Sequence, residues 1–184
     1  MLASLAALLL ESTAPSPAVA ELQRQLSIAE GRVVPAAEAL PEDRYGFAPS
    51  HGEFAGVRTF LEQVKHVAAV NYLILSGIRG TPPPEHVNDG RGPDAIRTKA
   101  DALRYLNDSY LFAHAAVAEI TSESLLAPLG SGAGGPVSSR LGLVGLAALH
   151  AMDHYGQMAV YLRMNGVIPP ATQKEIKQKQ RRND

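Results

Sequence analysis

The feature that most constrains the fold is an apolar segment carrying two histidines four residues apart, His150 and His154. Leucine, valine, alanine and glycine fill residues 141–149, and further apolar side chains follow His154 at helical spacing. Two serines at 138–139 can cap the start of a helix, and two prolines at 169–170 prevent its continuation. The sequence therefore predicts one long helix ending near residue 165, with both histidines on one face.

Two imidazoles at this spacing lie about 6 Å apart on a helix, within reach of one divalent metal ion. The same face otherwise carries Leu143, Ala147 and Tyr161, which indicates that it is buried. A buried imidazole needs partners for its ring nitrogens, and two charged rings would repel each other. A metal ion meets both demands, although a pair of ordinary core histidines is the alternative. Because two histidines alone bind a metal weakly, a third ligand must come from elsewhere.

Two of the four other histidines lie in predicted helices. His66 lies beside the apolar stripe of a helix predicted from about residue 54 to 78, and antiparallel packing would bring it opposite the pair. His114 has a similar position in a helix predicted from residue 99 to about 122, and it is the rival third ligand. For either residue, a core histidine with ordinary hydrogen bonds is the alternative interpretation.

Two glutamines and an aspartate lie close to these histidines in sequence. Gln157, three residues after His154, shares the histidine face and is a candidate catalytic residue that orients a bound water; its alternative role is to contact another helix. Gln63, one turn before His66, has the same two interpretations. Asp153 is rotated by about 100° from its neighbour His154, which favours a surface position over a role as general base.

The pattern along the chain predicts an all-α protein, a four-helix bundle. A further helix is predicted over residues 18–40, with a bend or break near Gly31 and Pro35, and no segment alternates like a strand. We assign residues 1–17 to an N-terminal extension or signal-like segment, 18–170 to the bundle and 171–184 to a polar basic tail. Such a tail is typically solvated and unstructured.

Composition excludes several classes of function. There is no cysteine, so any metal must be held by nitrogen and oxygen ligands. A net charge of −1 argues against nucleic-acid binding.

The apolar run at residues 5–10 is too short to span a membrane. Small residues at 18–20 imitate a cleavage site, but Glu11 interrupts the run and no basic residue precedes Arg24, which favours a cytoplasmic location over export.

Three stretches together resemble the DinB-like superfamily. They are residues 62–72 around His66, the stretch 150–170 that ends in Gly-Val-Ile-Pro-Pro, and the loop Leu-Pro-Glu-Asp-Arg-Tyr-Gly-Phe-Ala-Pro at 40–49. The resemblance covers about residues 19–170. It rests on the order of the histidines, one followed later in the chain by a pair four residues apart, and on the loop at 40–49 and the Gly-Val-Ile-Pro-Pro sequence that ends at residue 170.

The resemblance implies a bundle of the DinB/YfiT-like type, often a homodimer, with a divalent metal ion, nickel or zinc, held by His66, His150 and His154. The superfamily includes transferases and isomerases that use low-molecular-weight thiols such as bacillithiol, mycothiol or glutathione. Three protein ligands leave room for a substrate, so a thiol-dependent S-transferase or a hydrolase is expected. The alternative is a non-catalytic stress-response or interaction protein with a structural metal.

Overall fold

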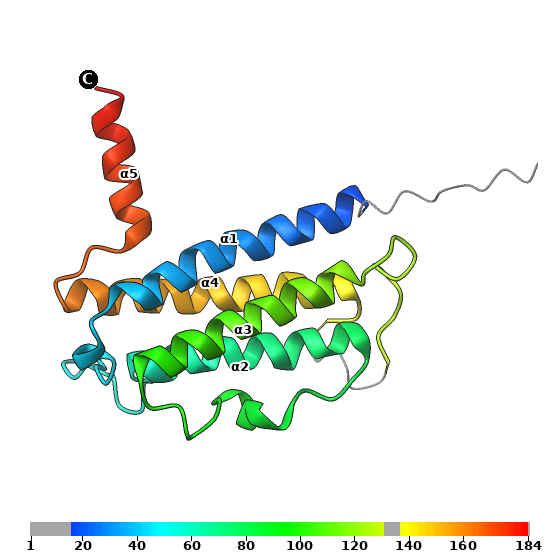
Figure 1. Ribbon diagram of the computed structural model, residues 1–184, viewed down its shortest axis with the longest axis horizontal. Coiled ribbons are helices and arrows are strands. Elements are labelled where there is room, and N and C mark those ends of the chain that lie inside the picture. Colours follow the sequence, from blue (N-terminus) through cyan, green and yellow to red (C-terminus); the bar gives the residue numbers. More distant parts are fainter. Residues whose placement is uncertain (1–15, 131–136, 184) are drawn as a thin grey trace, which may run out of the picture.

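The computed structural model describes residues 16–130 and 137–183, and within them the fold is all-α, as predicted (Figure 1). The α-helices are α1 (Pro17–Ala39), α2 (Phe60–Arg79), α3 (Lys99–Ala118), α4 (Arg140–Met164) and α5 (Pro170–Arg181). Two short 3-10 helices, η1 (Glu42–Arg44) and η2 (Glu85–Gly90), lie in the loops before α2 and α3. Helices α1 to α4 pack side by side, whereas α5 projects from the end of α4 (Figure 1).

Hydroxyl side chains define where the packed helices begin. Each accepts a hydrogen bond from a backbone N–H in the first turn, which satisfies one of the donors that a helix start leaves unpaired. These capping residues are Ser16, Thr59, Thr98 and Ser139. The caps expected at Thr98 and in the 138–139 pair are therefore confirmed, and the third helix ends at Ala118 rather than near residue 122.

The predicted start of the second helix was wrong. The helix begins at Phe60 because Thr59 and Glu62 form a reciprocal capping box, in which each side chain binds the backbone N–H of the other. Phe54 and Val57, which continue the apolar period upstream, lie in the preceding loop and are 41% and 37% exposed. The capping box therefore sets the start of the helix at Phe60, although the apolar pattern alone would extend it further upstream.

Of the bend or break expected near Gly31 and Pro35, the break does not occur. Helix α1 continues through Pro35 to Ala39, although this proline cannot donate the backbone hydrogen bond to Gly31 four residues earlier. Val33, Ala36 and Ala37 on either side of Pro35 are completely buried. Packing of this face outweighs the local cost of the proline.

The core lies between the four packed helices, and each of them has two neighbours among the others. Helix α1 packs against α3 and α4, and α2 packs against α3 and α4. The largest fully buried side chains come from all four helices: Leu26, Phe60, Leu75, Leu106, Tyr110, Leu143, Met158 and Leu162. Figure 1 shows that α2 and α4 run in opposite directions. This pairing sets the face that carries His66 against the face that carries His150 and His154.

Most of the basic tail is helical, contrary to expectation. Helix α5 begins with Pro170 at its first position, where a missing N–H costs no hydrogen bond, and continues with lysine, glutamine and glutamate, which are good helix formers. None of its residues is buried. A helix without a buried face leaves no apolar period in the sequence.

The signal-like segment falls mostly within residues 1–15, outside the described part of the chain. Its last small residues, at 18–20, lie in the first turn of α1, where Val19 is buried. None of the helices within residues 16–130 and 137–183 combines the length and the apolar character that crossing a membrane requires.

Candidate metal centre

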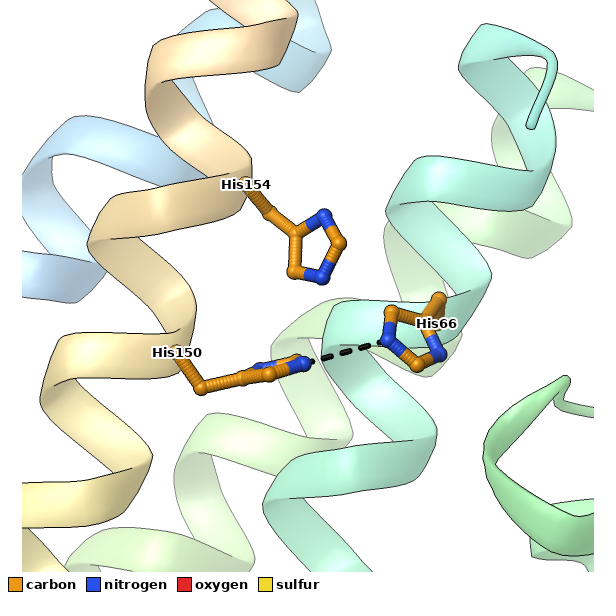
Figure 2. Close-up of side chains that lie close together, drawn as sticks. All are labelled: His66, His150 and His154. Carbon is orange, nitrogen blue, oxygen red and sulfur yellow. Dashed lines mark hydrogen bonds between the residues drawn. The ribbon is translucent and has the colours of Figure 1, made fainter. Parts of the chain in front are cut away.

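Helices α2 and α4 bring His66, His150 and His154 together (Figure 2). One possible ligand atom from each ring lies within 4.8 Å of the other two. The ring centroids are 4.5 to 4.9 Å apart. The pair on α4 meets the single histidine of α2 because the two helices are in direct contact. The structure thus assembles the three histidines that the sequence resemblance named.

Hydrogen bonds fix the protonation of two of the rings. His66 Nδ1 lies 2.6 Å from the carbonyl oxygen of Gly90, and His154 Nδ1 lies 2.6 Å from Oε1 of Gln63. Both oxygens can only accept, so each Nδ1 carries the hydrogen and each Nε2 of the neutral ring keeps its lone pair. These two rings are therefore held in the tautomer that binds a metal through Nε2.

The spacing of the facing nitrogens fits a metal ion. His66 Nε2 and His150 Nε2 are 3.1 Å apart. Two nitrogens at ordinary bonding distance from one zinc ion lie roughly 2.9–3.4 Å from each other, depending on the angle between the bonds. His150 Nδ1 is buried without a hydrogen-bond partner in the described part of the chain, so no hydrogen bond holds that side of the ring. The orientation of His150 therefore depends on the contact that its Nε2 makes.

Burial keeps the three rings neutral. Burial first, and the neighbouring histidine rings second, lower the pKa of His150 to about 3 and the pKa of His154 to about 4. Burial also lowers the pKa of His66, against an opposing contribution from the hydrogen bond to Gly90. At neutral pH the cluster therefore presents uncharged imidazoles, the form that a metal ion requires.

A relay of side-chain hydrogen bonds extends from His154 to the surface. Gln63, only 1% exposed, accepts from His154 and donates from Nε2 to Oε1 of Gln157 over 2.8 Å. Gln157 in turn donates from Nε2 to the carboxylate of Asp153 over 3.0 Å. Gln63 thus positions a histidine ring, Gln157 joins α4 to α2 through Gln63, and Asp153 lies exposed at the outer end of the relay.

The hydrogen-bond partner of His66, the carbonyl oxygen of Gly90, was not predicted from the sequence. Gly90 lies in η2, within a segment that composition alone describes as a surface loop, and its φ of +83° suits glycine. A Cβ at this position would lie 3.3 Å from Leu73 Cδ1 and 3.4 Å from Val70 Cγ2. Asn88 and Asp89 before it also adopt positive φ. The Asn-Asp-Gly run was a signal for such a turn, but it did not reveal which side chain the turn would meet.

His114, the rival third ligand, belongs to a different cluster. Its Nδ1 lies 2.6 Å from Gln23 Oε1 and its Nε2 lies 2.8 Å from Glu30 Oε2, both on α1. Helix α3 therefore turns this histidine toward α1, away from the α2–α4 contact. His114 is therefore a partly exposed histidine held by ordinary side-chain contacts to Gln23 and Glu30, and it is not a core residue.

Removing the partner of His154 should weaken metal binding. We expect Gln63→Leu to lower the affinity for zinc about 10–100-fold, because loss of a residue that orients a ligating histidine typically has this effect. Gln23→Leu provides a matched control, since it removes the glutamine that contacts His114 and leaves the cluster intact. Titration against a chromophoric chelator measures both variants. Equal affinities for the two would contradict the orienting role of Gln63.

The fold and the site together define a class of protein: an all-helical protein in which three imidazole rings converge. These three rings could hold a metal ion. Residues 25–158, from within α1 to within α4, match the profile of the DinB superfamily. The chain therefore belongs to the DinB superfamily. The matched region includes all three histidines. No curated protein matches the chain.

Proposed function

We propose that the protein is an enzyme that uses a divalent metal ion held by His66, His150 and His154. The observation that supports this proposal best is the convergence of three neutral rings, two of them held by hydrogen bonds at Nδ1 in the tautomer whose Nε2 carries the lone pair. Three protein ligands are typical of catalytic sites, whereas closed structural sites use four. The geometry therefore favours an open site over a structural one.

The reaction that we favour is thiol-dependent S-transfer, ahead of hydrolysis. A divalent ion in this cluster supplies Lewis acidity, which lowers the pKa of a thiol or of water. Because the chain has no cysteine, the thiol must come from a low-molecular-weight cosubstrate. In the transfer, the sulfur bonds to an electrophilic carbon, the leaving group departs with its electron pair, and the thiol proton passes to solvent.

The chain's own residues hold and orient the site. Gln63 and the carbonyl of Gly90 fix two rings. Gln157 is the residue that we propose to orient a water or substrate beside them, because its amide nitrogen has two hydrogens and Asp153 accepts one. Nickel and zinc are the ions that we favour, since imidazole ligands suit both.

An activity panel with and without metal tests the proposal. Full-length protein loaded with nickel or zinc is assayed for consumption of thiols in the presence of electrophiles, and for hydrolysis of activated esters. We expect activity in the first assay, lost on chelation and restored by the ion. Thiol-independent ester hydrolysis would favour the hydrolase instead. Loss of several kcal/mol of stability on chelation, with no activity in either assay, would favour the structural alternative.

We also propose that the protein forms a homodimer. Helices α1 and α4 expose a common apolar surface formed by Ile28, Leu149 and Met152, which together line one shallow cavity. Leu149 is 72% exposed, and burying such a surface against a second copy would be favourable. Light scattering on the full-length protein measures the oligomeric state, and a monomer at all concentrations would contradict the proposal.

A further inference from the structure

A cationic cavity lies beside the histidine cluster. Its volume is about 530 Å³, within the range typical of small-molecule sites. Three basic side chains, Arg58, Lys65 and Arg91, line it together with two acidic ones, Glu62 and Asp94. The balance of charge in the cavity depends on which of these groups are already engaged by the protein.

Lys65 is the unusual member of the group. It is only 7% exposed, yet it makes no hydrogen bond or ion pair within the part of the chain that the structure describes. Its ammonium nitrogen is not among the buried polar atoms without a partner, so the buried part is the aliphatic stem and the charged end reaches solvent. Because Lys65 lines the cavity, an anion bound there would supply the missing partner.

The two acidic groups accept hydrogen bonds from neutral groups of the protein, which orient them but leave their negative charge in place. The carboxylate of Glu62 accepts from the backbone N–H and the hydroxyl of Thr59 as part of the capping box. Asp94 accepts from Nδ2 of Asn88 at 3.4 Å. The guanidinium of Arg91 makes one hydrogen bond, to Asn88 Oδ1 at 3.3 Å, which leaves most of its donors free. With three basic and two acidic side chains, the lining keeps one positive charge in excess, and the hydrogen-bond donors of Arg91 are mostly free.

Two segments connect the cavity to the histidines. Lys65 immediately precedes His66 on α2, and Arg91 immediately follows Gly90, whose carbonyl binds His66. Two residues of the cavity lining are thus direct chain neighbours of His66 and of the glycine whose carbonyl binds it.

We infer that the cavity formed by Arg58, Lys65 and Arg91 binds the carboxylate or phosphate group of an acidic small molecule. Guanidinium groups pair with both anions through two parallel hydrogen bonds, and the ammonium of Lys65 adds a point charge. The inference rests on the proposed function in one respect: it makes that molecule the substrate or thiol cosubstrate, anchored by its anionic group while its reactive group faces the histidines.

Titration of the isotope-labelled, full-length protein with succinate, inorganic phosphate and succinamide tests the inference. We expect succinate or phosphate to shift the amide resonances of residues 56–65 and 91–94, and the tighter of the two anions identifies the preferred group. Neutral succinamide should leave these resonances unchanged. Shifts from succinamide equal to those from succinate, or anion shifts spread over the whole surface, would overturn the inference.

Two variants locate the binding charge. Lys65→Met keeps the aliphatic stem and should weaken anion binding about tenfold, because it removes a charge-assisted contact. Lys174→Met, in the exposed helix α5, loses the same charge and should bind as the wild type does. Arg91→Gln, at an exposed position, should also weaken binding. Equal weakening by Lys65→Met and Lys174→Met, or wild-type binding by both Lys65→Met and Arg91→Gln, would overturn the inference.

The metal content of the same samples separates the two proposals. Lys65→Met should take up zinc as the wild type does, because it removes no ligand. If the wild type takes up no metal, the proposed function fails, while anion binding to the cavity is still measured on the metal-free protein. If metal binds but neither anion does, the inference fails and the proposed function stands.

Discussion

Replacing His66 with alanine should lower the affinity for zinc or nickel by more than about 100-fold, because it removes a metal ligand. Loss of a residue that only orients a ligand typically lowers the affinity about 10–100-fold. His66 is the contribution of α2 to the cluster, and the two histidines of α4 alone would leave most of the coordination sphere to solvent. Titration against a chromophoric chelator measures the change. Alanine at His150 or His154 should have an effect of the same order.

Two other histidines supply the controls for this experiment. His86 is exposed and packs against the rings of Tyr72 and Tyr105, and His114 is bound to Gln23 and Glu30 on α1. His86→Ala and His114→Ala should therefore bind metal as the wild type does. An equal loss of affinity in His66→Ala and His114→Ala would show that the ligand set is wrong.

The metal-free protein should lose stability as the pH falls from 7 to 5. An unfolded histidine has a pKa near 6.5, whereas the folded pKa values are about 3 for His150 and about 4 for His154. Below pH 6.5 the unfolded chain therefore takes up protons that the folded cluster does not. Each of the two rings should cost about 2 kcal/mol at pH 5, a loss that grows with falling pH until the folded pKa is reached.

Urea unfolding of chelator-treated protein at the two pH values measures this loss. His150→Gln should reduce the difference between pH 7 and pH 5 by up to about half, because it removes the ring whose pKa is lowered most. His51→Gln, in an exposed loop, should leave the difference unchanged. A wild-type stability that is the same at pH 5 and pH 7 would contradict the buried, neutral state of the cluster.

Much of the site could be predicted because its signals are local. The apolar run around His150 and His154 specifies a buried helix, and their four-residue spacing puts both rings on one face. The hydroxyl caps at Thr98 and Ser139 are equally local. The sequence period placed both His66 and His114 beside apolar stripes, however, and only the packing of α2 against α4 separates them.

The remaining errors have physical causes in competing local effects and in long-range packing. The apolar period continued upstream to Phe54, but the capping box at Thr59 starts the helix later. Pro35 weakens a helix locally, yet the buried face of α1 carries the helix past it. The carbonyl of Gly90 reaches His66 from 24 residues away in sequence, and no local pattern encodes that contact.

Helix α5 shows a different kind of limit. Its sequence is strongly polar and contains too few apolar side chains to form a buried face, so the stripe of apolar residues that marks the other helices is missing. Helix propensity and the proline at its start were the only available signals. Composition alone could therefore identify a solvated tail but not its conformation.

Elemental analysis of the purified full-length protein after exposure to nickel and zinc, followed by removal of unbound ions, tests the central claim most directly. We expect the wild type to retain one ion per chain, and His66→Ala, His150→Ala and His154→Ala to retain little or none. Failure of the wild type to retain either ion, or equal retention by the wild type and all three variants, would contradict a metal centre at these histidines.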